Sequence, residues 1–151
     1  MAAGAKDRAL RLLGVRSRSR EELRRRLSQA GFPEGEITGA LQDLERAGLV
    51  DDERFAEEVV RWRLSRQGYG RRAALDTLRK AGVERSIAEG ALAGAGWVDE
   101  EARAEEVGRA RLARLEGLPP ETARRRLMGF LLRRGFDPEV ARTVCARLLR
   151  G

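Results

Sequence analysis

The chain has 151 residues, 42% of them hydrophobic, and its 31 basic and 24 acidic side chains give a formal net charge of +7. This length and composition support one modest domain or a few very small units with buried cores, and they exclude a chain that is disordered throughout. The absence of histidine excludes Ser–His and Cys–His nucleophiles, and the single cysteine, Cys145, excludes an intrachain disulfide and a cysteine-based zinc site.

Helix-forming residues dominate the chain and no β-branched run indicates a strand, so we predict an all-α fold. Glycine follows most of the segments with helical apolar periodicity, as expected where helices end in the left-handed conformation. Together these signals predict nine helices, over residues 5–15, 19–30, 34–47, 51–67, 70–81, 84–95, 99–116, 119–134 and 138–150.

The predicted helices group into three units of three, because the sequence repeats. An ungapped match at an offset of 48 relates LVDDERFAEEVV at 49–60 to WVDEEARAEEVG at 97–108, with seven of twelve residues shared. We therefore predict three-helix repeats at 1–50, 51–98 and 99–151. Each is too small to be very stable alone, so we expect the units to pack on one another in an elongated body, straight or curved. Compact units joined end to end and a single nine-helix globule are the alternatives.

The arginine-rich stretch RSRSREELRRRL at 16–27 contains the start signal of a folded helix. Ser19 is a good N-cap, and Glu22 three residues later completes a capping box. Glu21 with Arg25 and Glu22 with Arg26 are ion pairs at the favourable i,i+4 spacing. We therefore predict an amphipathic helix here and not a disordered tail.

For Arg20 and Arg24, which lie one turn apart, we expect no partner acid at helical spacing, and the other units have arginines in stretches without acids, an unfavourable surface unless something anionic binds there. Because such arginines recur in every unit, we predict a basic face that contacts a long polyanion such as DNA or a nucleoprotein filament. For any single arginine, a solvated surface position is the alternative. The first unit supplies Arg16, Arg18, Arg20 and Arg24, the second Arg61, Arg63, Arg66, Arg71 and Arg72, and the third Arg124, Arg126, Arg133 and Arg134.

Tyr69, between Gly68 and Gly70, joins this face as the aromatic candidate for a phosphate or base contact, with packing in the turn as the alternative. The other aromatic residues mostly fall at core spacing, Trp62 among them, so base stacking is not expected as a main binding mode. The predicted starts of the helices at 51 and 99 are crowded with acids, which indicates helix-dipole stabilisation or, alternatively, an acidic face for a protein partner.

No motif for catalysis or cofactor binding is present. The chain has no GxxxxGK[ST] phosphate loop, and its carboxylates lie among charged residues that would not raise their pKa values. We predict a protein that is not an enzyme, with no catalytic, cofactor-binding or metal-binding residues. No apolar stretch approaches the roughly 18 residues that span a bilayer and no signal sequence opens the chain, so we expect a cytoplasmic location.

The order of these features resembles the RecX family of regulatory proteins. The similarity covers nearly the whole chain, through LRLLGVRSRSREELRRRLSQAGF, ALQDLERAGLVDDERFAEEVVRWRLSRQGYG, LRKAGV and RRRLMGFLLRRGFDPEV. Its most specific part is the junction of the first two units, with Leu44, Gly48, Leu49, Asp52, Phe55 and Ala56 followed by an arginine-rich helix that ends at Gly68, Tyr69 and Gly70.

This resemblance implies three tandem three-helix repeats that bind the RecA recombinase, above all RecA filaments on single-stranded DNA. It also implies modulation, chiefly inhibition, of ATP hydrolysis, strand exchange in DNA recombination and repair, and the co-protease activity that triggers the SOS response. Family members also bind DNA, so contact with duplex DNA is expected as well. No cofactor is implied, and we expect a monomer.

Two other functions stay open from the sequence. Three-helix units resemble the modules of sequence-specific transcription regulators, which would show strong preference for one duplex site. No predicted helix carries a clear base-reading set of Asn, Gln and Arg, so this is the weaker hypothesis. A helical scaffold that binds protein alone would shift no DNA at any salt concentration.

Overall fold

The computed structural model describes residues 4–63, 68–94 and 99–150, and every regular element within these ranges is helical. The all-α prediction is confirmed. The helices are α1 (Ala5–Val15), α2 (Arg20–Gln29), α3 (Glu34–Arg46), α4 (Asp52–Arg61), α5 (Arg71–Lys80), α6 (Arg85–Gly94), α7 (Glu100–Leu112), α8 (Pro120–Arg133) and α9 (Pro138–Leu148), with a short 3-10 helix, η2 (Ala113–Leu115), after α7.

The boundaries follow the predicted ranges closely, with two differences. The helix expected over 51–67 ends as α4 at Arg61, and residues 64–67 lie outside the described residues. The helix expected over 99–116 narrows into η2 after Leu112. Gly117 follows η2 in the left-handed conformation, as the sequence predicts for the glycine that ends this helical segment.

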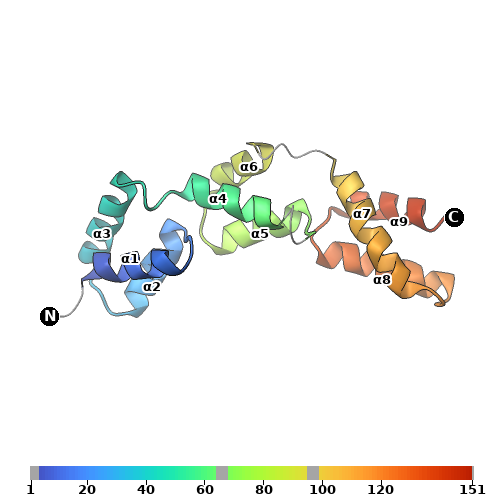
Figure 1. Cartoon of the computed structure of the whole chain (residues 1–151), viewed down its shortest axis with the longest axis horizontal. Helices are drawn as coiled ribbons and strands as arrows, with labels where there is room; N and C mark the ends of the chain where they lie inside the picture. The colour runs from blue at the N-terminus through green and yellow to red at the C-terminus, as the bar shows by residue number, and fades with distance from the viewer. Residues whose placement is uncertain (1–3, 64–67, 95–98, 151) are drawn as a thin grey trace.

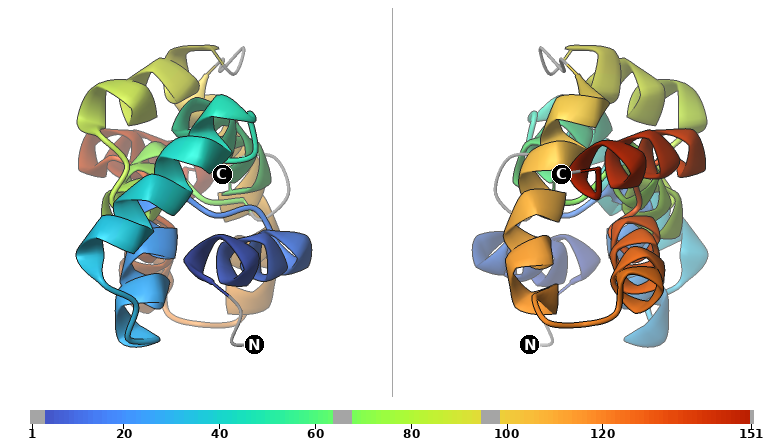
Figure 2. Two further views of the ribbon diagram at one scale, coloured as in Figure 1. Left: turned by 90° about the vertical axis from the view of Figure 1, so that its left-hand side faces the viewer. Right: turned by 90° about the vertical axis from the view of Figure 1, so that its right-hand side faces the viewer.

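Three groups of helices follow one another along the long axis of the molecule. Figure 1 shows α1–α3, α4–α6 and α7–α9 in a row, with the two ends of the chain at opposite ends of the body. Viewed along that axis, the groups lie behind one another (Figure 2). The alternative of a single nine-helix globule is therefore wrong, and the elongated arrangement is confirmed.

Each group has its own hydrophobic core. The first contains Leu23 and Leu41, the second Val60 and Leu78, and the third Leu127, all fully buried. In every group the first helix packs against the third, and one alanine of that first helix has no exposed surface, so the two backbones approach closely. These alanines are Ala9, Ala56 and Ala104.

The middle helices α2, α5 and α8 all end in the same way. Gly31, Gly82 and Gly135 follow them with φ of 92°, 76° and 85°, the left-handed region that glycine enters without strain. The next residue then turns back on the helix. Its N–H bonds to a carbonyl in the last turn, as from Phe136 to Leu131 at 3.1 Å, and its side chain packs on the core.

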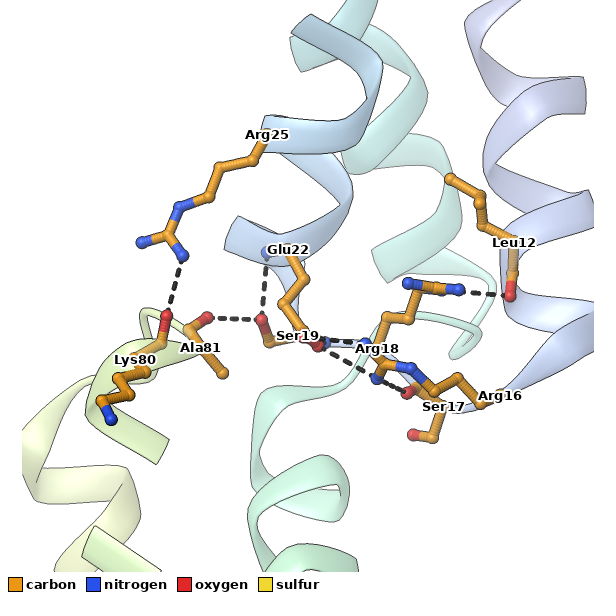
Figure 3. Close-up of polar contacts among 9 residues, drawn as sticks. All are labelled: Leu12, Arg16, Ser17, Arg18, Ser19, Glu22, Arg25, Lys80 and Ala81. Atoms are coloured by element: carbon orange, nitrogen blue, oxygen red, sulfur yellow. Dashed lines mark hydrogen bonds and ion pairs between the residues drawn. The ribbon is translucent and has the colours of Figure 1, made fainter. Parts of the chain in front are cut away.

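The C-terminal turns of α5 and α8 each contact the start of the middle helix in the preceding group. At the first joint, the Ser19 hydroxyl donates to the Ala81 carbonyl at 2.6 Å, and the Arg25 guanidinium donates to the Lys80 carbonyl at 2.7 Å (Figure 3). The N–H of Arg20 donates to the Asp52 carboxylate at 2.8 Å. The N-terminus of α2 thus faces the C-terminus of α5, a favourable alignment of helix dipoles.

The second joint repeats this plan with backbone groups. The N–H of Gly70 donates to the Arg134 carbonyl at 2.7 Å, and that of Arg72 donates to the Gly135 carbonyl at 3.0 Å. The N–H of Arg71 donates to the Glu100 carboxylate at 3.0 Å, as Arg20 does to Asp52. These two acids therefore join neighbouring groups.

Candidate nucleic-acid interface

Two arginines predicted to lack acidic partners have them in the structure. Arg24 forms a bidentate ion pair with Glu21, with its Nη2 2.6 Å from Oε1 and its Nε 2.8 Å from Oε2. Hydrogen bonding from Arg24 holds the pKa of the Glu21 carboxyl below its ordinary value. Arg20 contacts Glu45 of α3 through Nε at 2.6 Å. The prediction that these arginines are unmatched is wrong.

The other two arginines of the first unit are also engaged. Arg16 pairs with Glu22 at 3.0 Å, so Glu22 serves this arginine in addition to the capping box. Arg18 is only 8% exposed, and its Nε donates to the Leu12 carbonyl at 3.2 Å (Figure 3). Burial lowers the pKa of its guanidinium, to which nearby Arg16 adds. The four predicted interface arginines of the first unit thus make contacts within that unit.

Among the predicted interface arginines that the structure describes, the exposed ones that have no ion pair belong to the second and third units. Among the described residues, six of the predicted interface arginines are exposed and contact no acid: Arg61, Arg71, Arg72, Arg124, Arg126 and Arg133. The predicted contact residue Arg66 lies outside the described residues. These six arginines of the predicted interface lie on α4, α5 and α8.

Tyr69 lies in a stack of aromatic rings and guanidinium groups. Arg63 and Arg134 lie over its ring, with Cζ 4.8 and 4.9 Å from the centroid. Arg134 also lies 5.0 Å from the ring of Phe130, over which Arg111 lies at 4.9 Å. Such cation–π contacts stabilise by about 0.5 to 2 kcal/mol each. Because the stack links the loop before α5 to α7 and α8, Tyr69 helps to hold the second and third units together.

An open cleft of about 1120 Å³ extends along α4 and α5 to both joints. We call it the α4–α5 cleft. Phe55, Val59 and Ala73 line it with apolar surface, and Trp62 adds an indole that is 51% exposed. The expectation that Trp62 is a core residue is therefore wrong. The basic side chains in its lining are Arg16, Arg63, Arg72, Lys80 and Arg133.

The cleft also has three acids, and each has a basic partner in the protein. Glu22 contacts Arg16 at 3.0 Å, and Glu58 lies 3.7 Å from Arg54. The third acid, Asp76, contacts Arg79 at 2.8 Å and Lys80 at 3.0 Å, which hold its pKa below the ordinary value. The cleft therefore retains positive charge after its own acids are neutralised.

The described residues contain no group of three or more side chains that could hold a metal ion. In the same part of the chain, no helix has the length and apolar character that crossing a membrane requires. Cys145 is buried against Met128, and burial raises the pKa of its thiol. The thiol is thus held in its unreactive protonated form.

The sequence of the chain is similar to the sequences of a known protein family. The models of the first, second and third three-helix domains of RecX match residues 5–44, 51–92 and 99–145. The chain is 42% identical to the Regulatory protein RecX of Amycolatopsis mediterranei over 146 residues, covering 97% of this chain and 83% of that protein. For the Regulatory protein RecX of Mycolicibacterium smegmatis the identity is 42% over 141 residues, covering 91% and 75%.

A solved structure agrees in fold. The crystal structure of RecX from Lactobacillus salivarius matches with a TM-score of 0.81 and 23% identity, over 95% of this chain and 94% of that one. Three domain matches in the expected order, together with relatives above 40% identity over most of the chain, agree with the three groups of helices described above. The chain belongs to the RecX family of regulatory proteins.

Proposed function

We propose that this protein binds RecA recombinase filaments on single-stranded DNA and inhibits their ATPase, strand-exchange and co-protease activities. The observation that carries the proposal is the set of six exposed arginines without ion pairs on α4, α5 and α8, in a body that is elongated (Figure 1). Such a surface suits a long polyanionic partner better than a compact one. The inhibitory direction follows from the resemblance to RecX proteins.

The arrangement supports binding to a filament more than a catalytic role. No described residue combines a cleft position with a nucleophile and an adjacent base, and Cys145 is buried. The protein therefore regulates RecA by binding to the filament, and its long body contacts filament subunits and DNA at the same time. The monomer expected from the sequence is part of this proposal.

RecA ATPase activity on single-stranded DNA tests the proposal. We expect the rate to fall in a dose-dependent manner as the protein approaches the RecA concentration. Arg72→Glu and Arg124→Glu should weaken the effect, because both side chains are exposed and without ion pairs. The matched control is Arg46→Ala, which removes an exposed arginine that is already paired with Asp43 at 2.8 Å.

An unchanged ATPase rate at stoichiometric protein would overturn the proposal. The alternative of a sequence-specific transcription regulator is tested separately, by selection from random duplex DNA. A filament regulator should enrich no single site, because phosphate contacts carry no sequence information.

A further inference from the structure

The side chain of Trp62 is unusual among the large apolar residues of the second unit. It lies just after α4, is 51% exposed and forms part of the α4–α5 cleft, whereas Phe55 on the same helix is 6% exposed. The other large apolar residues with comparable exposure do not line the cleft; they are Leu10, Val15, Leu49 and Leu132. Of the described residues that line the cleft, Trp62 is thus the large apolar side chain with the most exposed surface.

Several cations line the same cleft as this indole. Arg63 is its chain neighbour and is positioned by the ring of Tyr69 at 4.8 Å. Arg72 and Arg133 also line the cleft, and neither contacts an acid among the described residues. Because the acids of the cleft already have basic partners, these three guanidinium groups remain available to an anion, and arginine suits the planar oxygens of phosphate.

We propose that the α4–α5 cleft is a binding site for an unpaired base of single-stranded nucleic acid. The base stacks on Trp62, and Arg63, Arg72 and Arg133 contact the phosphates on either side. This deepens the proposed function, on which it rests, by assigning the cleft to the nucleic acid rather than to the RecA protein. It also reverses the expectation from sequence that base stacking plays little part.

A polypeptide with acidic and apolar side chains is the competing occupant. An indole beside several guanidinium groups fits a nucleotide better, because stacking needs one flat aromatic surface while the phosphates need cations at its edge. Duplex DNA offers no such match, since its bases are stacked on one another. The site therefore predicts a preference for single strands.

The fluorescence of Trp62 gives a direct test. The chain has two tryptophans, so Trp97→Phe leaves Trp62 as the only tryptophan, which is excited selectively at wavelengths that tyrosine does not absorb. This variant is titrated at low salt with a short oligothymidylate, with an abasic strand of equal length and with a duplex. We expect strong quenching by oligothymidylate and little change with the abasic strand or the duplex, because only an unpaired base can stack on the indole.

The second test measures the affinity of the protein for labelled strands by fluorescence anisotropy. Trp62→Ala should weaken oligothymidylate binding about tenfold, the usual loss for one stacked base, and leave abasic-strand binding unchanged. The matched control is Leu132→Ala, which removes an exposed apolar side chain outside the cleft. Circular dichroism melts confirm that each variant is folded.

Three results would overturn the assignment. One is equal quenching by the abasic strand and oligothymidylate, and another is an unchanged affinity of Trp62→Ala for oligothymidylate. The third is a change in Trp62 fluorescence when RecA is added without DNA, together with no change when oligothymidylate is added, which would make the cleft a protein-docking site.

RecA inhibition is measured separately for each variant. Loss of inhibition with normal quenching would reject the proposed function alone, and normal inhibition without quenching would reject the base site alone.

Discussion

The hydroxyl of Ser19 donates a 2.6 Å hydrogen bond to the carbonyl of Ala81, which lies 62 residues further along the chain. The same hydroxyl oxygen accepts the N–H of Glu22 at 3.1 Å, so one buried side chain starts α2 and also joins it to the end of α5. Capping and joining of units are thereby coupled at one residue.

Ser19→Ala is expected to destabilise the protein by about 2 to 3 kcal/mol. Loss of the cap accounts for about 1 to 2 kcal/mol and loss of the bond to Ala81 for about 1 kcal/mol. Denaturant unfolding followed by circular dichroism measures the change. Ser17→Ala, at an exposed position nearby, is the control and should lie within about 0.5 kcal/mol of wild type. Equal effects of the two substitutions would contradict this account of the joint.

A comparison of two glycines isolates the second joint. Gly117 and Gly135 have φ of 88° and 85°, so alanine at either position costs about 1 to 2 kcal/mol in backbone strain. A Cβ at Gly117 would meet open space, whereas at Gly135 it would collide with the side chain and backbone of Ala73. We expect Gly135→Ala to lose about 1 to 3 kcal/mol more than Gly117→Ala in denaturant unfolding. Similar losses of stability in the two variants would show that the second joint accommodates the added methyl group without an energetic cost, and would contradict the prediction.

Acid should destabilise the first unit through Glu22. Burial alone would raise the pKa of this carboxyl, but hydrogen bonds from Arg16 and from the N–H of Ser19 outweigh it and lower the pKa. A carboxyl with a lowered pKa in the folded state stabilises above its unfolded pKa of about 4.3, and that contribution disappears as pH falls through the folded value.

Free energies of unfolding measured from neutral pH down into this acidic range check the sign. The wild type should lose stability more steeply with acid than Glu22→Gln, which has no carboxyl to protonate. Glu84→Gln, at an exposed position, serves as the control and should follow the wild-type curve. A steeper fall for Glu22→Gln than for wild type would contradict the prediction.

Salt should reveal which arginines contact phosphate. Each phosphate neutralised on a single strand contributes about 0.7 to the slope of log affinity against log salt. Arg124→Ala should therefore reduce this slope by about that amount in titrations with oligothymidylate, because Arg124 is exposed and contacts no acid among the described residues. The control is Arg46→Ala, whose guanidinium is held by Asp43, and equal slopes for the two variants would exclude Arg124 as a contact.

Local signals in the sequence were sufficient for the helices and their caps. The capping box needs only Ser19 and Glu22, three residues apart, and the structure confirms both of its hydrogen bonds. The Arg24–Glu21 pair lies at i,i+3 and was equally accessible to sequence reasoning. A count of i,i+4 partners alone overlooks this pair.

Contacts between helices could not be predicted in this way. Arg20 meets Glu45 across 25 residues, and this pairing exists only because α2 and α3 pack together. Trp62 has the spacing of a core residue, yet the buried stripe of α4 ends at Val60 and leaves the indole in the cleft. Helical periodicity assigns a side chain to a face of its own helix, and the neighbouring units decide whether that face is covered.

The two joints differ in how mutation can reshape the molecule. At the second, backbone groups of Gly70 and Gly135 meet directly, so most side-chain changes nearby leave the relative orientation of the units as it is. At the first, side-chain groups of Ser19, Arg25 and Asp52 make the hydrogen bonds that join the units. Substitutions of these side chains can therefore alter the angle at the first joint in small steps, which under the proposed function makes it the place where the length of the body would be matched to a filament.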